Sequence, residues 1–205
     1  MIAIKNIHSK FHIISCIPPQ IDFQLVKTTI KYIDDLSHLN VEIFKYLDST
    51  NNYLLRRKNY DFNQQCIDIV IAEVQTQGRG RYGRSWTCGL GEGLTFSLSK
   101  FFKLNSVAMS GLSLVIGIAV IRVLNQFGIL VVGLKWPNDV IVADNLQKIA
   151  GILIDLQHVS PCISRAIIGI GINFDLSQTT INLVNKNITD LSMLVDFKLN
   201  KNIFL

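Results

Sequence analysis

The chain has 205 residues, 49% of them hydrophobic, and can therefore bury one sizeable core. Its net charge of +5 suits a small polyanion such as a nucleotide as well as it suits nucleic acid. The four cysteines are dispersed without a Cys-x-x-Cys pair, which argues against a zinc site or a disulfide framework and for a reducing cytosol.

Two hydrophobic stretches bear on localisation. Phe11–Ile17 is too short and too polar for the core of a signal peptide. Leu104–Ile121 carries no charge, but it is at the lower edge of the ~20 residues that span a membrane and contains four Asn and Ser residues. We therefore predict a buried helix, a cytoplasmic protein and no membrane contact.

The N-terminal part of the chain carries few signals. Residues 1–40 are expected to be an extension or the remnant of a preceding domain, with a helix at about Phe23–Leu36. A strand is predicted at Val41–Tyr46, followed by a helix that Ser49 or Thr50 caps. These hydroxyls have two interpretations: capping alone, or hydrogen bonding to a buried polar ligand as well.

The most informative stretch is Gln77–Trp86, in which three glycines and three arginines alternate between two predicted strands, Ile67–Val74 and Leu94–Ser99. Glycine lets a backbone approach a ligand closely, and arginine fits phosphate and carboxylate oxygens in pairs. The pattern matches neither a Walker loop nor a dinucleotide fingerprint. We predict an anion-binding loop; the alternatives are a nucleic-acid-binding tract and a solvated turn.

The second half of the chain is predicted to hold a long helix, Val107–Phe127, capped by Ser106 and ended by Gly128. Two apolar strands follow within Gly133–Val142, one before and one after the Lys-Trp-Pro-Asn-Asp segment, and further strands are predicted at Lys148–Ile154 and Ile167–Phe174. Lys148 is at the beginning of its strand, where a lysine is usually a solvated gatekeeper. Two alternate glycines in the last strand leave one face bare, either for a flat ligand or for tight packing with the long helix.

Five segments, in this order, closely resemble the bacterial biotin–protein ligases: Leu47–Leu55, Ala72–Trp86, Lys135–Asp139, Gln147–Leu153 and Gly169–Asn173. The resemblance implies an α+β fold of the class II synthetase-like type: a mixed, mainly antiparallel sheet with helices packed on one side. It implies that residues 41–205 are the ligase catalytic domain. The implied reaction joins biotin and ATP into biotinyl-5'-AMP, with Mg²⁺, and moves biotin to a lysine of the biotin carboxyl carrier protein of acetyl-CoA carboxylase.

The resemblance also assigns site residues. Lys148, Arg79 and Arg81 would be catalytic, stabilising charge as the carboxylate attacks the α-phosphate. The residues expected to bind biotin are Ser49, Thr50, Gln75, Gly78, Arg79, Arg81, Lys148, Gly151, Gly169 and Gly171. The residues expected on the nucleotide side are Arg81, Arg84, Trp86, Lys135, Asn138, Asp139 and Asn173. No protein-held metal site is expected.

The chain departs from the family at both ends. About forty residues precede Val41, too few for the winged helix-turn-helix of the bifunctional members, so DNA binding is not expected, whereas a homodimer is compatible with the family. Only 31 residues follow Phe174, so the domain is expected to be shortened, and the bare chain to be poorly soluble or a weak ligase. The alternatives are a lipoate–protein ligase, which shares the fold and the adenylate chemistry, and, in another class, a basic nucleic-acid-binding module.

Overall fold

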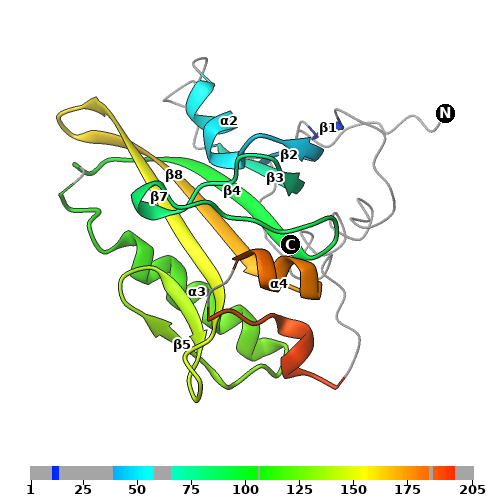
Figure 1. Cartoon of the computed structure of the whole chain (residues 1–205). Coiled ribbons are helices and arrows are strands. Elements are labelled where there is room, and N and C mark those ends of the chain that lie inside the picture. The colour runs from blue at the N-terminus through cyan, green and yellow to red at the C-terminus, as the bar shows by residue number, and fades with distance from the viewer. Residues whose placement is uncertain (1–10, 14–38, 58–65, 106, 185–186, 197–205) are drawn as a thin grey trace.

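The computed structural model describes residues 11–13, 39–57, 66–105, 107–184 and 187–196 (Figure 1). Within these residues one eight-stranded sheet has the order β1-β2-β3-β4-β8-β7-β6-β5. Its strands are β1 (Phe11–Ile13), β2 (Leu39–Leu47), β3 (Ile67–Gln75), β4 (Gly93–Phe102), β5 (Val132–Lys135), β6 (Asp139–Val142), β7 (Lys148–Ser160) and β8 (Ile163–Asn173).

The sheet is mixed. β1, β2 and β3 run parallel to one another at one edge, and every other neighbouring pair is antiparallel. The predicted mixed, mainly antiparallel fold is therefore confirmed. The predicted strands at Val41–Tyr46, Ile67–Val74 and Leu94–Ser99 correspond to β2, β3 and β4.

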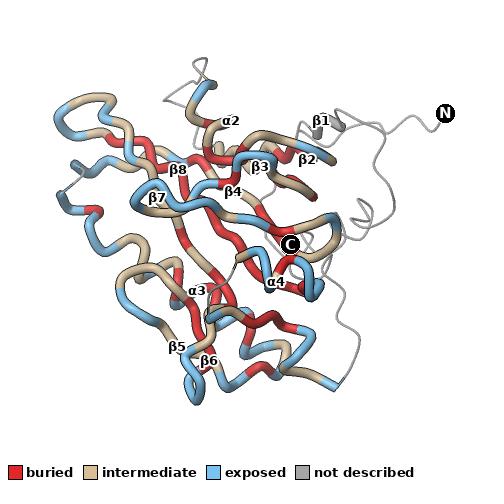
Figure 2. Tube along the Cα trace, in the orientation of Figure 1, coloured by how far each residue is buried: buried red, intermediate tan, exposed pale blue. Residues whose placement is uncertain are grey.

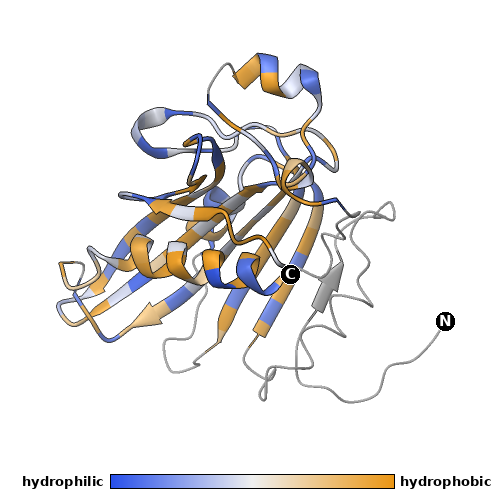
Figure 3. Ribbon diagram, turned by 90° about the horizontal axis from the view of Figure 1, so that it is seen from below, coloured by the Kyte–Doolittle hydropathy of each residue, from blue (hydrophilic) through white to orange (hydrophobic). Residues whose placement is uncertain are grey.

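The alternation of side chains along β8 places the helices. Ile168, Ile170 and Ile172 pack in one core with Val120 and Leu124 of α3 (Leu112–Gln126). Ile167, which points to the opposite face, packs with Leu54 of α2 (Thr50–Arg56). The long helix thus covers one face as expected (Figure 3), and the short α2 lies on the other face.

This alternation also explains the stability of the centre. Almost every residue of β8 is buried, and the buried part of the chain follows β8, β4 and β3 (Figure 2). Each fully buried isoleucine contributes about 1.5–3 kcal/mol. A rigid central sheet is the support on which the loops at its edges are held.

The predicted start of the long helix is wrong. The helix begins at Leu112 rather than Val107, because residues 107–111 form turns in which Asn105 Oδ1 accepts a hydrogen bond from the backbone N–H of Ala108. Ser106, the predicted cap, lies outside the described residues. The predicted end is correct, since Gly128 adopts a φ of 80° just after the helix. None of the described helices is long and apolar enough to cross a membrane.

The hairpin of β7 and β8 is longer than the sequence predicted. Polar residues between Asp155 and Arg165 interrupt the apolar pattern, yet both strands continue through this stretch. Arg165 is fully buried there and donates to Ser99 Oγ and to the carbonyl oxygen of Leu54 at the end of α2.

Two elements after β8 were not predicted: α4 (Gln178–Val184) and the short 3₁₀ helix η3 (Leu191–Leu194). The helix expected at Phe23–Leu36 and the last nine residues lie outside the described part of the chain.

Candidate active site

A cleft of about 400 Å³ lies on the sheet face that α2 occupies. Its walls come from α2, the end of β3, the glycine–arginine loop, the β5–β6 turn, the beginning of β7, the end of β8 and Asn187–Ile188. The predicted site residues that line it are Ser49, Thr50, Gln75, Arg79, Arg81, Arg84, Trp86, Lys135, Asn138, Asp139, Lys148, Gly151, Gly169 and Gly171. Gly78 and Asn173 do not line this cleft.

One end of the cleft is a buried polar network. Gln75 Oε1 accepts from both the backbone N–H and the hydroxyl of Thr50, at 2.8 and 3.1 Å. Ser97 Oγ lies 2.6 Å from both Thr50 Oγ1 and Asn51 Oδ1. Ser49 is the N-cap of α2 and is buried as well. Capping and ligand binding are therefore compatible at this junction, because the hydroxyls that begin α2 also face the cleft.

The glycine–arginine loop is an internally bonded hairpin rather than an open tract. The N–H of Trp86 donates to Gly78 O at 2.8 Å, and that of Gly80 donates to Arg84 O at 2.6 Å, with one 3₁₀ turn, η2 (Arg81–Gly83), at the tip. A Cβ on residue 78 would lie 2.3 Å from Trp86 O. Gly78 therefore closes the hairpin, and its position is fixed by the backbone opposite rather than by a ligand in the cleft.

The three arginines of the loop have different partners. Arg79 pairs with Asp155 and donates to Asn52. Arg81 donates to Asn138 Oδ1 at 3.2 Å, which joins the loop to the β5–β6 turn across the cleft. Arg84 lines the cleft near the tip, and its guanidinium lies 5.8 Å from the centre of the Tyr82 ring.

Lys148 is partly buried and paired, unlike a solvated gatekeeper. Its Nζ lies 2.7 Å from Asp139 Oδ1 and 5.4 Å from the centre of the Trp86 ring, inside the cleft. Its backbone is fixed on both sides: its N–H donates to Asn187 O, and its carbonyl accepts from Asn173 Nδ2 at 3.3 Å. Asn173, expected on the nucleotide side, is therefore placed to hold the strand that carries the lysine.

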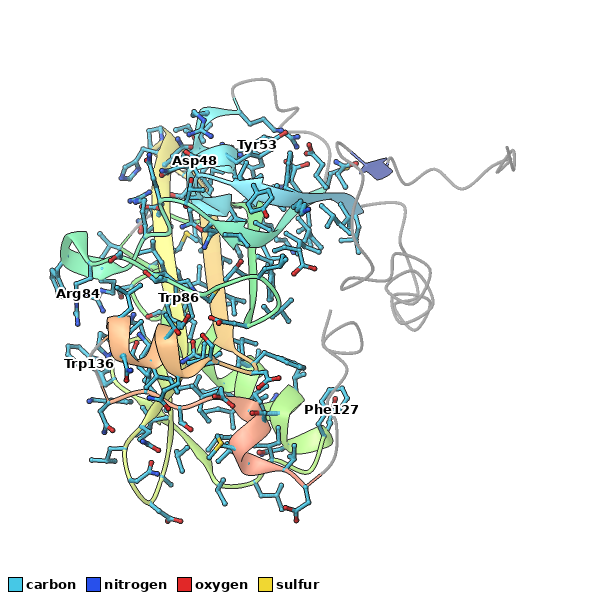
Figure 4. The ribbon with its side chains drawn as sticks, turned by 45° about the vertical axis from the view of Figure 1, so that its right-hand side comes forward. Asp48, Tyr53, Arg84, Trp86, Phe127 and Trp136 are labelled. Carbon is cyan, nitrogen blue, oxygen red and sulfur yellow. The ribbon has the colours of Figure 1, made fainter. Side chains whose placement is uncertain are left out.

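The floor of the cleft is built from glycines that make room for other side chains. A Cβ on Gly171 would lie 2.4–2.8 Å from atoms of the Trp86 indole, and one on Gly169 would lie 2.2 Å from Asn51 Oδ1. The prediction that these glycines allow tight packing is thus correct. The partners are Trp86 and Asn51 rather than the long helix, which lies on the other face. Figure 4 shows Trp86 near the middle of the molecule beside β7 and β8, whereas Arg84 and Trp136 lie toward one edge.

The β5–β6 turn presents the other predicted nucleotide residues. Asn138 is bonded to β7 in two ways, both at 2.9 Å. Its side-chain Nδ2 donates to Ile152 O, and its backbone carbonyl accepts from the N–H of Ile152. Asp139 follows it and pairs with Lys148, and Lys135 is exposed at the rim. Among the described residues no group of three or more His, Cys, Asp or Glu side chains is placed to hold a metal ion.

The unpredicted residues of the cleft lining include Asn51 and Ile188, and Asp155 lies just outside the lining, beneath the loop. Asn51 follows the capping hydroxyls and offered a signal as a polar residue in a segment otherwise assigned to ligand binding. Asp155 interrupts an apolar strand, which is also a usable signal. Ile188 joins the cleft through a backbone bridge to Lys148, a contact that no local pattern indicates.

Comparisons with known proteins show the family of the chain. Residues 43–173 match the biotin/lipoate A/B protein ligase family, and the chain belongs to that family. It is 38% identical over 147 residues to the bifunctional ligase/repressor BirA of Escherichia coli, and 29% identical over 160 residues to the biotin–[acetyl-CoA-carboxylase] ligase of Mycobacterium tuberculosis. These alignments cover 72% and 75% of this chain.

The fold also has counterparts among solved structures. The biotin protein ligase of Leishmania major in complex with biotinyl-5-AMP superimposes with a TM-score of 0.61 at 24% identity, over 80% of this chain and 70% of that one. The chain spans 44% of the length of the E. coli relative and 56% of that of the M. tuberculosis relative.

Proposed function

We propose that the chain is the catalytic part of an ATP-dependent biotin–protein ligase. It would form biotinyl-5'-AMP and transfer biotin to a lysine of the biotin carboxyl carrier protein of acetyl-CoA carboxylase. The observation that carries the proposal is the single cleft that brings together the polar network at Thr50 and Gln75, the cations Arg81 and Lys148, and the β5–β6 turn.

In the first step a biotin carboxylate oxygen bonds to the α-phosphorus of ATP, and the bond from that phosphorus to the leaving pyrophosphate breaks. Two anions must approach each other, and Lys148 and Arg81 supply fixed positive charge where negative charge accumulates. Magnesium ion would arrive with the outer phosphates and neutralise them, since a site of this kind binds Mg²⁺ through substrate oxygens and few protein ligands. Asp139, which lines the cleft, would be the protein carboxylate that helps to hold the ion.

In the second step the acceptor lysine's amine attacks the acyl carbon and AMP leaves. The adenylate is a mixed anhydride that water would hydrolyse. The loop crosses the cleft and is joined to its far wall through Arg81 and Asn138. A loop in this position supports the proposal, because it can exclude water until the acceptor arrives.

The polar network favours biotin over lipoate. A ureido ring offers donors and acceptors that can add to the hydrogen bonds among Thr50, Gln75 and Ser97, whereas an apolar dithiolane offers none to this polar end of the cleft. The nucleic-acid alternative is less favoured, because Arg79 and Lys148 are each paired with an aspartate and Arg81 donates to Asn138, rather than forming an open cationic track.

Pyrophosphate release tests the proposal. The chain with Mg-ATP should release pyrophosphate when biotin is added, and more slowly with lipoate. Thr50→Val keeps the shape but removes the hydroxyl, so it should reduce turnover of biotin more than that of lipoate, while Thr179→Val on the exposed part of α4 serves as the control. No release with either acid, combined with salt-sensitive binding of DNA in a gel shift, would favour the nucleic-acid module instead.

A further inference from the structure

The first arginine of the loop differs from the other two in where its charge is directed. Arg79 donates to Asn52 Oδ1 at 2.7 Å on α2, and its two terminal nitrogens lie 3.3 and 3.4 Å from the carboxylate oxygens of Asp155 on β7. Figure 1 shows the loop crossing β7 close to α2. The guanidinium is therefore occupied by the protein's own groups at the place where the loop leaves the sheet.

Asp155 is itself held in one orientation. Its Oδ2 accepts a hydrogen bond of 2.8 Å from Nδ2 of Asn51, which is 97% buried and covers Gly169. The other end of the Asn51 amide accepts from Ser97 Oγ. The carboxylate is only 22% exposed, and the Arg79 side chain 38%. A fixed carboxylate beneath a partly exposed arginine can anchor the loop.

The anchor has an electrostatic reason. Three arginines within six residues repel one another, and the repulsion favours an open loop. One carboxylate placed under the first arginine offsets part of this repulsion. All three arginines line the cleft, and the charges of Arg81 and Arg84 remain available to a ligand there. Because Asp155 lies outside the cleft lining, the anchor and the ligand do not compete for it.

We propose that Asp155 is a positioning residue: with Asn52 it holds the guanidinium of Arg79, and the resulting contact, here called the latch, keeps the loop closed over the cleft. The catalytic charge in the loop then comes from Arg81, and Arg79 acts on the loop rather than on the substrate. The loop-closing role stands on this geometry alone, and its effect on the adenylate rests on the proposed function.

The first test uses the free chain and needs no activity. Asp155→Asn and Arg79→Gln should each raise the rate of tryptic cleavage after Arg81 and Arg84 by roughly two- to five-fold, the scale of a partly exposed ion pair. The double variant should cleave no faster than either single variant, because both changes break the same contact. Asp144→Asn, which removes an exposed carboxylate in the β6–β7 turn, is the control for net charge.

The second test compares the rate of adenylate formation with the rate at which the bound adenylate dissociates. In Asp155→Asn, bound biotinyl-5'-AMP should dissociate roughly two- to five-fold faster, while the rate of pyrophosphate formation at saturating substrates changes little. Wild-type cleavage rates in Asp155→Asn, or additive effects in the double variant, would overturn the latch. If the chain forms no adenylate at all, the proposed function fails, and the cleavage rates of the free chain still decide whether the latch exists.

Discussion

At the scale of single residues, the largest effect on catalysis is expected from replacing Lys148. Its ammonium lies in the cleft between Asp139 and the Trp86 ring, where it can meet both the attacking carboxylate and the α-phosphate. Lys148→Ala should slow pyrophosphate release by ~10²-fold or more, the effect of removing one preorganised charge-stabilising group. Lys148→Arg should restore only part of the rate, because a planar fork does not replace a point charge.

The control for this variant is Lys100→Ala, which removes an exposed lysine from β4. Equal rates of pyrophosphate release in Lys148→Ala and Lys100→Ala would mean that Lys148 is a surface gatekeeper after all. The ion pair with Asp139 would then be a structural contact at the beginning of β7.

A second residue-scale prediction concerns the contact of Gly171 with Trp86. A Cβ at Gly171 must displace the indole, so Gly171→Ala should lower the free energy of unfolding by about 1–3 kcal/mol, the usual cost of overpacking. In a Trp86→Ala background the same change should cost much less, because the obstacle is gone. Gly133→Ala, where nothing lies within 4 Å of the added methyl group, is the matched control.

Urea denaturation of the five chains (wild type, Gly171→Ala, Trp86→Ala, the double variant and Gly133→Ala) gives the comparison directly. The same cost of Gly171→Ala with and without the indole would show that Trp86 does not rest on this glycine, and the floor of the cleft would then be open to a ligand at that position.

At the scale of elements, the stability of the junction between β2 and α2 should fall at acid pH. The hydrogen bond from the Arg56 guanidinium, more than any other contact, lowers the pKa of Asp48 from 3.8 to about 2. A lowered pKa means that the charged carboxylate stabilises the fold. This contribution is complete above pH 3.8 and is lost as the pH falls toward 2.

We predict that the unfolding free energy of Asp48→Asn falls less steeply with decreasing pH than that of the wild type. Between pH 5 and pH 2.5, roughly one unit either side of the titration, the wild type should lose more unfolding free energy than the variant does. Glu92 acts in the same direction, since hydrogen bonds from Ser177 and Thr180 outweigh the effect of burial and lower its pKa. Parallel acid limbs in the wild type and in Asp48→Asn would contradict the assignment of this junction.

The elements themselves could largely be predicted from the sequence, and the contacts between them could not. Strands such as β3 and β4 can be predicted from the local pattern of their residues. The cap at Ser49 can be predicted from its residue type. The start of α3 was misplaced, because Val107–Gly111 has an apolar pattern but is held in turns by Asn105. The sequence predicts too short a β7–β8 hairpin, because an arginine such as Arg165 is normally expected at the surface. Its burial is understandable only once the carbonyl oxygens that accept its hydrogen bonds are known.

The site divides in the same way. The loop and Lys148 could be found from their residue types and order. The pairs that shape the cleft, Asn51 with Gly169 and Trp86 with Gly171, join residues more than eighty positions apart, and their contact depends on how the strands cross. The role of Asp155 follows only once β7 is seen beneath the loop.

At the scale of the whole molecule, the cleft is closed by segments from both halves of the sheet: α2 and the loop on one side, and the β5–β6 turn with Asn187–Ile188 on the other. A ligand that reaches from the Thr50 network to the β5–β6 turn would connect these halves, whereas under the proposed function biotin alone would touch mainly the first. A ligand that binds only the folded chain stabilises it by about 2.7 kcal/mol at one hundred times its Kd. For a domain of this size that corresponds to a rise in Tm of roughly 5–10 °C.

We therefore expect biotinyl-5'-AMP to raise the Tm by this amount, and by more than saturating biotin or ATP does separately, in a thermal melt followed by circular dichroism. Lys148→Ala should reduce the shift given by the adenylate, while Lys100→Ala should leave it intact. A short DNA duplex should give no shift at physiological salt, since salt reduces the gain from counterion release and so weakens purely electrostatic binding. A shift with the duplex and none with the adenylate would mean that the charges around the cleft serve a nucleic acid.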